Sequence, residues 1–189
     1  DNILDNKGAI YDLLSLRTYD YYTYTHSVNV AVLSVGLGMA VGLPKEQIRK
    51  LGIGAMLHDV GKSTIPPSII NKAGRLDDEE YRIIKTHVAE GENILRMNRD
   101  IPPESLIAVS QHHERLSGKG YPNNKAGFEI QPFGRITSIV DCYDALTTTR
   151  SYQAARTPFF ALSILTKETG DYDTDVLMAF IKMLGTIKA

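Results

Sequence analysis

The stretch KEQIRKLGIGAMLHDVGK, residues 45–62, shows most clearly how this chain folds. Its apolar residues Ile48, Leu51 and Ala55 recur every three to four positions, the spacing that places side chains on one face of an α-helix. Pro44 just before it suits a helix start, so we predict a helix from there to Asp59. The apolar face of this helix ends at His58 and Asp59, two residues that can bind a metal ion.

Helical periodicity continues along most of the chain, and alternating β-branched runs are nearly absent. We therefore predict an all-α, single-domain bundle of about seven helices, with irregular loops over a metal site. Besides the first, helices are expected at residues 24–41, 77–97, 103–114, 131–149, 158–167 and 174–184. The loops are expected at 63–75 and 116–132, which are rich in Gly and Pro.

The length and composition are those of an ordinary globular domain. The 189 residues carry a formal net charge of -1, so no broad basic surface indicates binding to long nucleic acid. No stretch is predicted to span a membrane, and the single Cys142 fits a reducing cytoplasm. Residues 1–21 are interpreted as a lead-in, truncated from a longer protein with an upstream sensor or receiver domain, and residues 22–189 as the catalytic domain.

The five histidines of the chain lie in a pattern. His26, His58, His87 and His113 each end or belong to an apolar helical stripe, so four separate helices direct an imidazole inward. One buried histidine usually has a structural role, but several in one small core need a common partner for their ring nitrogens. A metal ion is such a partner.

The metal-binding residues expected from this pattern outnumber the ligands of one tetrahedral ion. They are His26, His58, Asp59, His87, His112, His113 and Asp141. We therefore predict two divalent ions, with Asp59 bridging them, an arrangement that activates water and holds a phosphate. Because the set holds no cysteine, iron or manganese fits better than structural zinc, although other transition metals stay open.

Four motifs together resemble the HD-GYP family of metal-dependent phosphodiesterases. They are HDVGK at 58–62, KAGRL at 72–76, HHERLSGKGYP at 112–122 and DCYDALT at 141–147. The resemblance implies hydrolysis of cyclic di-GMP to linear pGpG, to GMP or to both. It also implies contact with GGDEF-type diguanylate cyclases through the loop Gly120-Tyr121-Pro122.

Several residues are candidates for substrate contact. Lys62 can reach a phosphate oxygen or assist the leaving group, and with Asp59 it is the predicted catalytic pair. Gly120 and Tyr121 can bring backbone and an aromatic ring to the ligand. Asp144 shares a helix face with Asp141 and is expected to orient either a ligand histidine or a guanine. The resemblance adds Arg150 as a phosphate contact. For Lys62, Tyr121, Asp144 and Arg150, the alternative of an ordinary surface residue stays open.

Three positions depart from the family pattern. Tyr22 stands where part of the family has a glutamate that holds a third metal, so we expect two ions. Ser117 and Gln153 replace an aspartate and a basic residue and predict a weaker grip on substrate. The alternatives are therefore a cyclic di-GMP-binding effector with weak catalysis, a phosphodiesterase preferring cyclic GMP-AMP, or a mononucleotide hydrolase, against which the Gly120-Tyr121-Pro122 loop argues.

Overall fold

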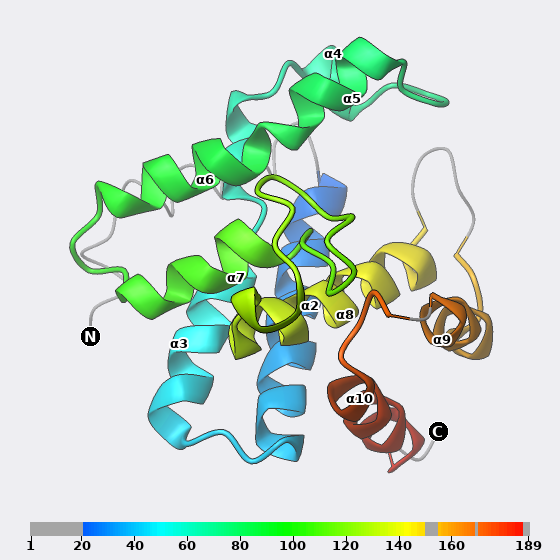
Figure 1. Cartoon of the computed structure of the whole chain (residues 1–189). Coiled ribbons are helices and arrows are strands. Elements are labelled where there is room, and N and C mark those ends of the chain that lie inside the picture. Colours follow the sequence, from blue (N-terminus) through cyan, green and yellow to red (C-terminus); the bar gives the residue numbers. More distant parts are fainter. Residues whose placement is uncertain (1–20, 150–154, 169, 187–189) are drawn as a thin grey trace.

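The computed structural model describes residues 21–149, 155–168 and 170–186, and within these ranges the chain is helical with no β-strand (Figure 1). The elements in chain order are α2 (Tyr21–Ala40), α3 (Lys45–Met56), η1 (Val60–Thr64), α4 (Pro67–Ile70), α5 (Asp78–Lys85), α6 (His87–Arg96), η2 (Pro103–Ser105), α7 (Leu106–Gln111), η3 (Gly127–Glu129), α8 (Pro132–Thr147), α9 (Pro158–Lys167) and α10 (Thr174–Thr186), where η denotes a 3-10 helix. The predicted all-α fold is confirmed.

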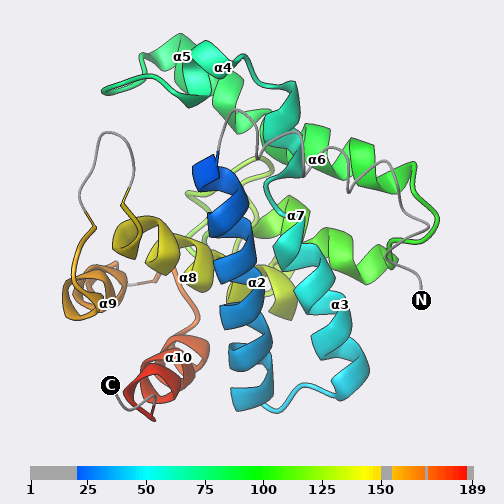
Figure 2. The same cartoon turned by 180° about the vertical axis from the view of Figure 1, so that it is seen from behind.

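Helix α2 runs through the centre of the molecule, between α3 on one side and α8 and α10 on the other (Figure 2). Its residues Val30 and Leu37 are fully buried in the main apolar core, which also contains Leu51 of α3, Ile139 of α8 and Phe180 of α10. Burial of such side chains stabilises a helical bundle by roughly 1.5–3 kcal/mol each. The core thereby fixes the helices that carry the predicted metal ligands.

Several predicted helices end earlier than expected, and three of these ends share one kind of contact. The Nδ1 atoms of His58, His87 and His112 lie 2.7, 2.6 and 2.8 Å from the backbone oxygens of the third residue before each. The contact satisfies one of the carbonyls that the last turn of a helix leaves without a backbone partner. Helix α3 ends at Met56 and α7 at Gln111.

The helix predicted at 77–97 is divided into α5 and α6 at Thr86, where two side chains bond carbonyls of the last turn of α5. The Thr86 hydroxyl donates to the oxygen of Ile83 at 2.7 Å, and the ring of His87 bonds the oxygen of Ile84. These are the two carbonyls that a continuous helix would give to backbone N–H groups. A further difference is the short helix α4, which lies inside the loop predicted at 63–75.

The segment after His58-Asp59 lies directly against the start of α6. A Cβ atom added to Gly61 would meet the backbone oxygen of His87 at 2.0 Å and the backbone nitrogen of Gly91 at 2.4 Å. Only glycine allows this approach. It brings His87 to the same point as the end of α3, although the two are separated by a long excursion of the chain.

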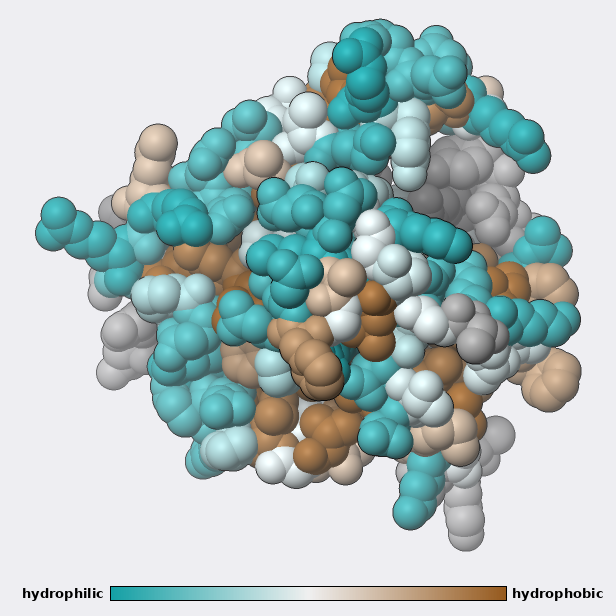
Figure 3. All heavy atoms as spheres, viewed as in Figure 1, coloured by the Kyte–Doolittle hydropathy of each residue, from teal (hydrophilic) through white to brown (hydrophobic). Residues whose placement is uncertain are grey.

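The surface shows no large uniform apolar face in the view of Figure 3, where hydrophilic residues cover the end of the molecule formed by α4 and α5. Among the described residues, no helix combines the length and the apolar character needed to cross a lipid bilayer.

Candidate metal centre

The predicted ligands converge at one place in the bundle, and they come from five separate segments. His26 belongs to α2, His58 and Asp59 follow α3, His87 begins α6, His112 and His113 follow α7, and Asp141 lies in α8. His87 Nε2 lies 3.3 Å and His112 Nε2 3.9 Å from Asp59 Oδ1. His26 Nε2 lies 3.0 Å from Asp141 Oδ1, and His113 Nδ1 lies 3.7 Å from Asp141 Oδ2.

Backbone contacts orient three of the imidazoles. The Nδ1 contacts of His58, His87 and His112 with carbonyls at the helix ends require a proton on that nitrogen, since a carbonyl only accepts. A neutral ring then has no proton left for Nε2, whose lone pair faces the centre. This is the tautomer that binds a metal ion.

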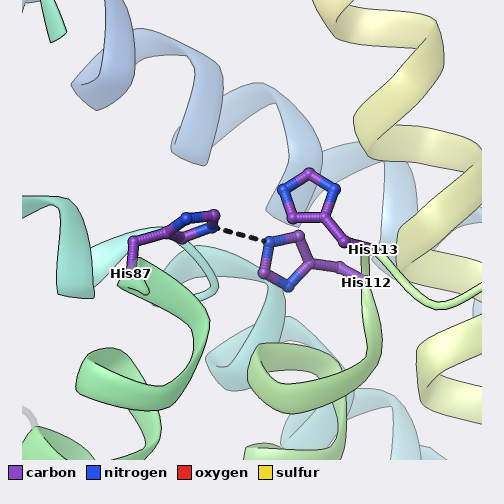
Figure 4. Close-up of side chains that lie close together, drawn as sticks. All are labelled: His87, His112 and His113. Carbon is purple, nitrogen blue, oxygen red and sulfur yellow. Dashed lines mark hydrogen bonds between the residues drawn. The ribbon is translucent and has the colours of Figure 1, made fainter. Parts of the chain in front are cut away.

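The donor atoms form two groups of three, each within 4.8 Å of one another. We name them the mixed group, which is His26, His58 and Asp59, and the imidazole group, which is His87, His112 and His113. Figure 4 shows the imidazole group, with His87 approaching from α6 and the two adjacent histidines from the end of α7. The Nε2 atoms of His87 and His112 are 3.3 Å apart.

The residues present fit a metal ion. His58 Nε2 and Asp59 Oδ1 are fully buried and have no hydrogen-bond partner. Such orphaned groups cost about 1–3 kcal/mol each unless something satisfies them. The facing Nε2 atoms of His87 and His112 are both acceptors, so neither satisfies the other. Divalent cations would satisfy all four atoms.

Burial keeps the imidazole group neutral. It lowers the pKa of His87 to about 4 and, together with the nearby His58, lowers the pKa of His112 to about 3. The pKa of His113 also falls well below its ordinary value because of burial and the adjacent His112. At neutral pH this group therefore presents lone pairs with no proton to displace.

The mixed group is instead a buried network of charges. Burial opposes the charged form of His26, but hydrogen bonds to Asp141 and Asp144 outweigh it and raise its pKa to about 9. Burial likewise acts to raise the pKa of Asp59 and Asp141, yet Lys62 at the first and His26 at the second hold both pKa values well below the usual range. The ammonium of Lys62 and the proton on His26 thus balance the charge of these two carboxylates.

Asp144 contacts the His26 ring on the side opposite to the nitrogen that faces the metal centre. Its Oδ2 atom is 2.6 Å from His26 Nδ1, while His26 Nε2 faces Asp141. Of the two predicted roles for Asp144, this contact supports the orientation of a ligand histidine. Carboxylates in this position fix the ring of a metal-binding histidine and raise its basicity.

Lys62 lies in η1, one turn after Asp59, and its ammonium donates to Asp59 Oδ2 at 2.6 Å. The side chain is 18% exposed, and Asp59 only 2%. The lysine therefore connects the buried carboxylate with the outside of the centre. Arg150 and Gln153 lie outside the described residues.

The loop at 116–132 packs Tyr121 against the metal centre, whereas its other aromatic residue, Phe128, is exposed. The Tyr121 ring stacks on His113 with centroids 4.5 Å apart, and its backbone N–H donates to the His113 oxygen at 3.1 Å. A Cβ atom on Gly120 would lie 2.4 Å from Glu114 Cα, so only glycine fits there. Ser117 is exposed, and its hydroxyl donates to Asp171 rather than to the metal centre.

Glu114 was not predicted to have a role. Its buried carboxylate accepts backbone N–H bonds from Asn123 at 2.8 Å and Lys125 at 2.9 Å, so it fixes the loop that carries Tyr121. The sequence signal was present, since a glutamate directly after two inward-facing histidines shares their burial. The spacing of residues in the sequence does not show its backbone partners, which lie nine and eleven residues later.

Comparison with known proteins identifies the family. The profile described as "HD domain" matches residues 9–176. The chain is 34% identical over 184 residues to the "Cyclic di-GMP phosphodiesterase PA4108" of Pseudomonas aeruginosa, covering 97% of this chain and 44% of that protein. This chain belongs to the HD domain family, in its HD-GYP branch.

Other relatives are named as phosphodiesterases of a different cyclic dinucleotide. The "3'3'-cGAMP-specific phosphodiesterase 2" of Vibrio cholerae is 37% identical over 150 residues, 78% of this chain and 29% of that protein. Among solved structures, Bd1817, described as a HDG"Y"P protein from Bdellovibrio bacteriovorus, superposes with a TM-score of 0.71 at 21% identity, covering 85% of this chain and 51% of that one. The fold is shared, and the HD-domain chain spans less than half of these two curated relatives.

Proposed function

We propose that this chain is a metal-dependent phosphodiesterase that hydrolyses cyclic di-GMP to linear pGpG, to GMP or to both. The observation that carries the proposal is the convergence of five imidazoles and two carboxylates, with buried donor atoms that lack partners. The names of the relatives support a cyclic dinucleotide as the substrate class.

Two divalent ions are proposed, one for each donor group. Asp59 is placed to serve both, since Oδ1 faces His87 and Oδ2 faces His58. Asp141 adds a second carboxylate between His26 and His113. When bound, such a pair of ions activates water and neutralises the charge that develops on a phosphate. The nitrogen and oxygen donors suit iron or manganese.

The residues of the chain have separate tasks in this proposal. Asp59, His58 and the other ligands would hold the ions, and Asp144 would orient His26. Lys62, which pairs with Asp59, lies where its ammonium could contact a phosphate oxygen or the departing oxygen once the carboxylate is used as a ligand. Tyr121 holds His113 in place and covers it from water.

The test is product formation by metal-replete protein. Purified chain, loaded anaerobically with Fe(II) or Mn(II), should convert cyclic di-GMP to linear product detectable by chromatography. His58→Ala should abolish the product and lower the bound metal, since it removes a buried ligand. Asp173→Asn is the matched control, because Asp173 pairs with Arg135 away from the donor groups.

Two outcomes would replace the proposal. Tight binding of cyclic di-GMP with no product under several metals would make the chain a binding effector, as the departures at Ser117 and Gln153 suggest. A higher kcat/KM for 3'3'-cGAMP than for cyclic di-GMP would move it to the substrate of its Vibrio relatives. Docking of a cyclase on the Gly120-Tyr121-Pro122 loop stays a prediction, as does the upstream domain.

A further inference from the structure

A cationic and aromatic cluster lies at the edge of the imidazole group, and two of its three residues, Tyr81 and Lys85, are outside the predicted site. Lys85 ends α5, two residues before His87. Its ammonium is 4.8 Å from the ring centroid of Tyr81 and 5.7 Å from that of Tyr121. We name Tyr81, Lys85 and Tyr121 the rim cluster.

The rim cluster adjoins the metal centre through one ring. Tyr121 stacks on His113 with centroids 4.5 Å apart, and His113 belongs to the imidazole group. Tyr81 is 50% exposed, whereas Lys85 is half-buried. The cluster therefore extends from the predicted metal ligand His113 to the solvent. A substrate larger than one phosphate group would extend from the metal centre in the same direction.

The charge of Lys85 has no carboxylate partner among the described residues. Other lysines of the chain differ: Lys62 pairs with Asp59, Lys50 with Glu104 and Lys72 with Glu80. The Tyr81 ring instead holds the Lys85 ammonium by a cation–π contact worth about 0.5–1 kcal/mol when exposed. The Lys85 ammonium is therefore held in place and can bind an anionic group of a ligand.

We infer that the rim cluster is the subsite for the half of a cyclic dinucleotide that is not being cleaved. A cyclic dinucleotide has two phosphodiester groups, and only one can occupy the metal centre at a time. Lys85 would bind the second phosphate, and the exposed Tyr81 ring would stack on the adjoining purine. This inference rests on the proposed function.

The experiment compares two substrates that share the reacting group. Bis(p-nitrophenyl) phosphate offers one phosphodiester and no second phosphate or purine, whereas cyclic di-GMP offers both. Lys85→Gln should lower the ratio of the two kcat/KM values, cyclic di-GMP over bis(p-nitrophenyl) phosphate, by about tenfold, the worth of one charge-assisted contact. The change should lie in KM for cyclic di-GMP, because Lys85 does not touch the reacting phosphate.

Matched variants separate this role from a structural one. Arg82→Gln removes a cation from the same helix, where Arg82 pairs with Glu79 on the exposed side, and should leave the ratio at the wild-type value. Tyr81→Ala should also lower the ratio, and Tyr81→Phe should retain it because the ring remains. Metal content measured for each variant reports on the integrity of the centre.

An unchanged ratio in Lys85→Gln, or an equal loss on both substrates, would overturn the subsite while leaving the phosphodiesterase intact. If the wild-type chain cleaves bis(p-nitrophenyl) phosphate but no cyclic dinucleotide, the proposed function fails, and the subsite fails with it. The two failures are therefore distinct.

Discussion

The two donor groups of the metal centre lie side by side but balance charge differently. The imidazole group is neutral, because burial lowers the pKa of His87 and His112 to about 4 and about 3. The mixed group is ionised, with Lys62 on Asp59 and a proton on His26, whose pKa is raised to about 9. One group is ready for an ion, and the other must first give up a cation.

This difference shows two ways in which one small bundle limits the cost of buried polar groups. In and beside the mixed group, the carboxylates of Asp59 and Asp141 are paired with Lys62 and His26, which avoids the large cost of an isolated buried charge. In the imidazole group, neutral rings avoid that cost and leave lone pairs unused. We expect the two groups to differ in pH dependence and in their response to substitution.

Asp59→Asn should have the largest effect, since this carboxylate is 2% exposed and directs Oδ1 toward His87 of the imidazole group and Oδ2 toward His58 of the mixed group. We expect kcat to fall on the order of 10³-fold or more and the content of both ions to drop. His112→Ala, by contrast, should reduce the metal content of the imidazole group first. Elemental analysis beside product assays checks this, and two ions retained in Asp59→Asn would contradict the shared role.

Asp144→Asn should weaken only the mixed group. The amide cannot stabilise a proton on His26 or raise the basicity of the ring as the carboxylate does. Changes of this kind usually cost about 10–100-fold in metal affinity. Competition with a chromophoric chelator measures it, and Asp173→Asn is again the control. An equal loss at both groups would argue that Asp144 supports the fold rather than one ligand.

The pH dependence of metal binding should separate the groups. Binding at the mixed group displaces the proton of His26, so its affinity should rise as pH increases from 7 toward about 9, by up to about tenfold per unit. The imidazole group is already deprotonated above about pH 4, so its affinity should stay flat over the same range. Calorimetry in buffers of different ionisation enthalpy counts the released protons. No release at either group would show that His26 is neutral before the ion binds.

Glu114→Gln should have the smallest effect, through the loop that supports His113. The buried carboxylate accepts two backbone N–H bonds, and the amide keeps one acceptor while turning a donor toward the other N–H. We expect the free energy of unfolding to fall by about 1–3 kcal/mol in urea titrations. Glu129→Gln is the control on the same loop, because its exposed carboxylate accepts one such bond and should matter less. An equal effect of both would remove the special role of Glu114.

The amino-acid sequence alone determined the helical class, the inward direction of the histidines and the family. Apolar spacing of three and four residues is a local property, and the four motifs lie at fixed positions along the chain. It also predicted that Asp144 shares a face with Asp141, a relation within one helix. The helix ends were predicted less well, since apolar spacing marks the face of a helix and not its last residue, and it did not show the contacts of His58, His87 and His112 with carbonyls of the last turn.

Only the tertiary structure decided which donors belong to which group. His87 reaches Asp59 because the bare backbone of Gly61 lets α6 approach, and His26 meets Asp144 across 118 positions of sequence. The same applies to the pKa values, which depend on burial and on partners from other helices. Spacing along one helix determines the direction of a side chain, but the distance between donors on different helices depends on how the whole core packs.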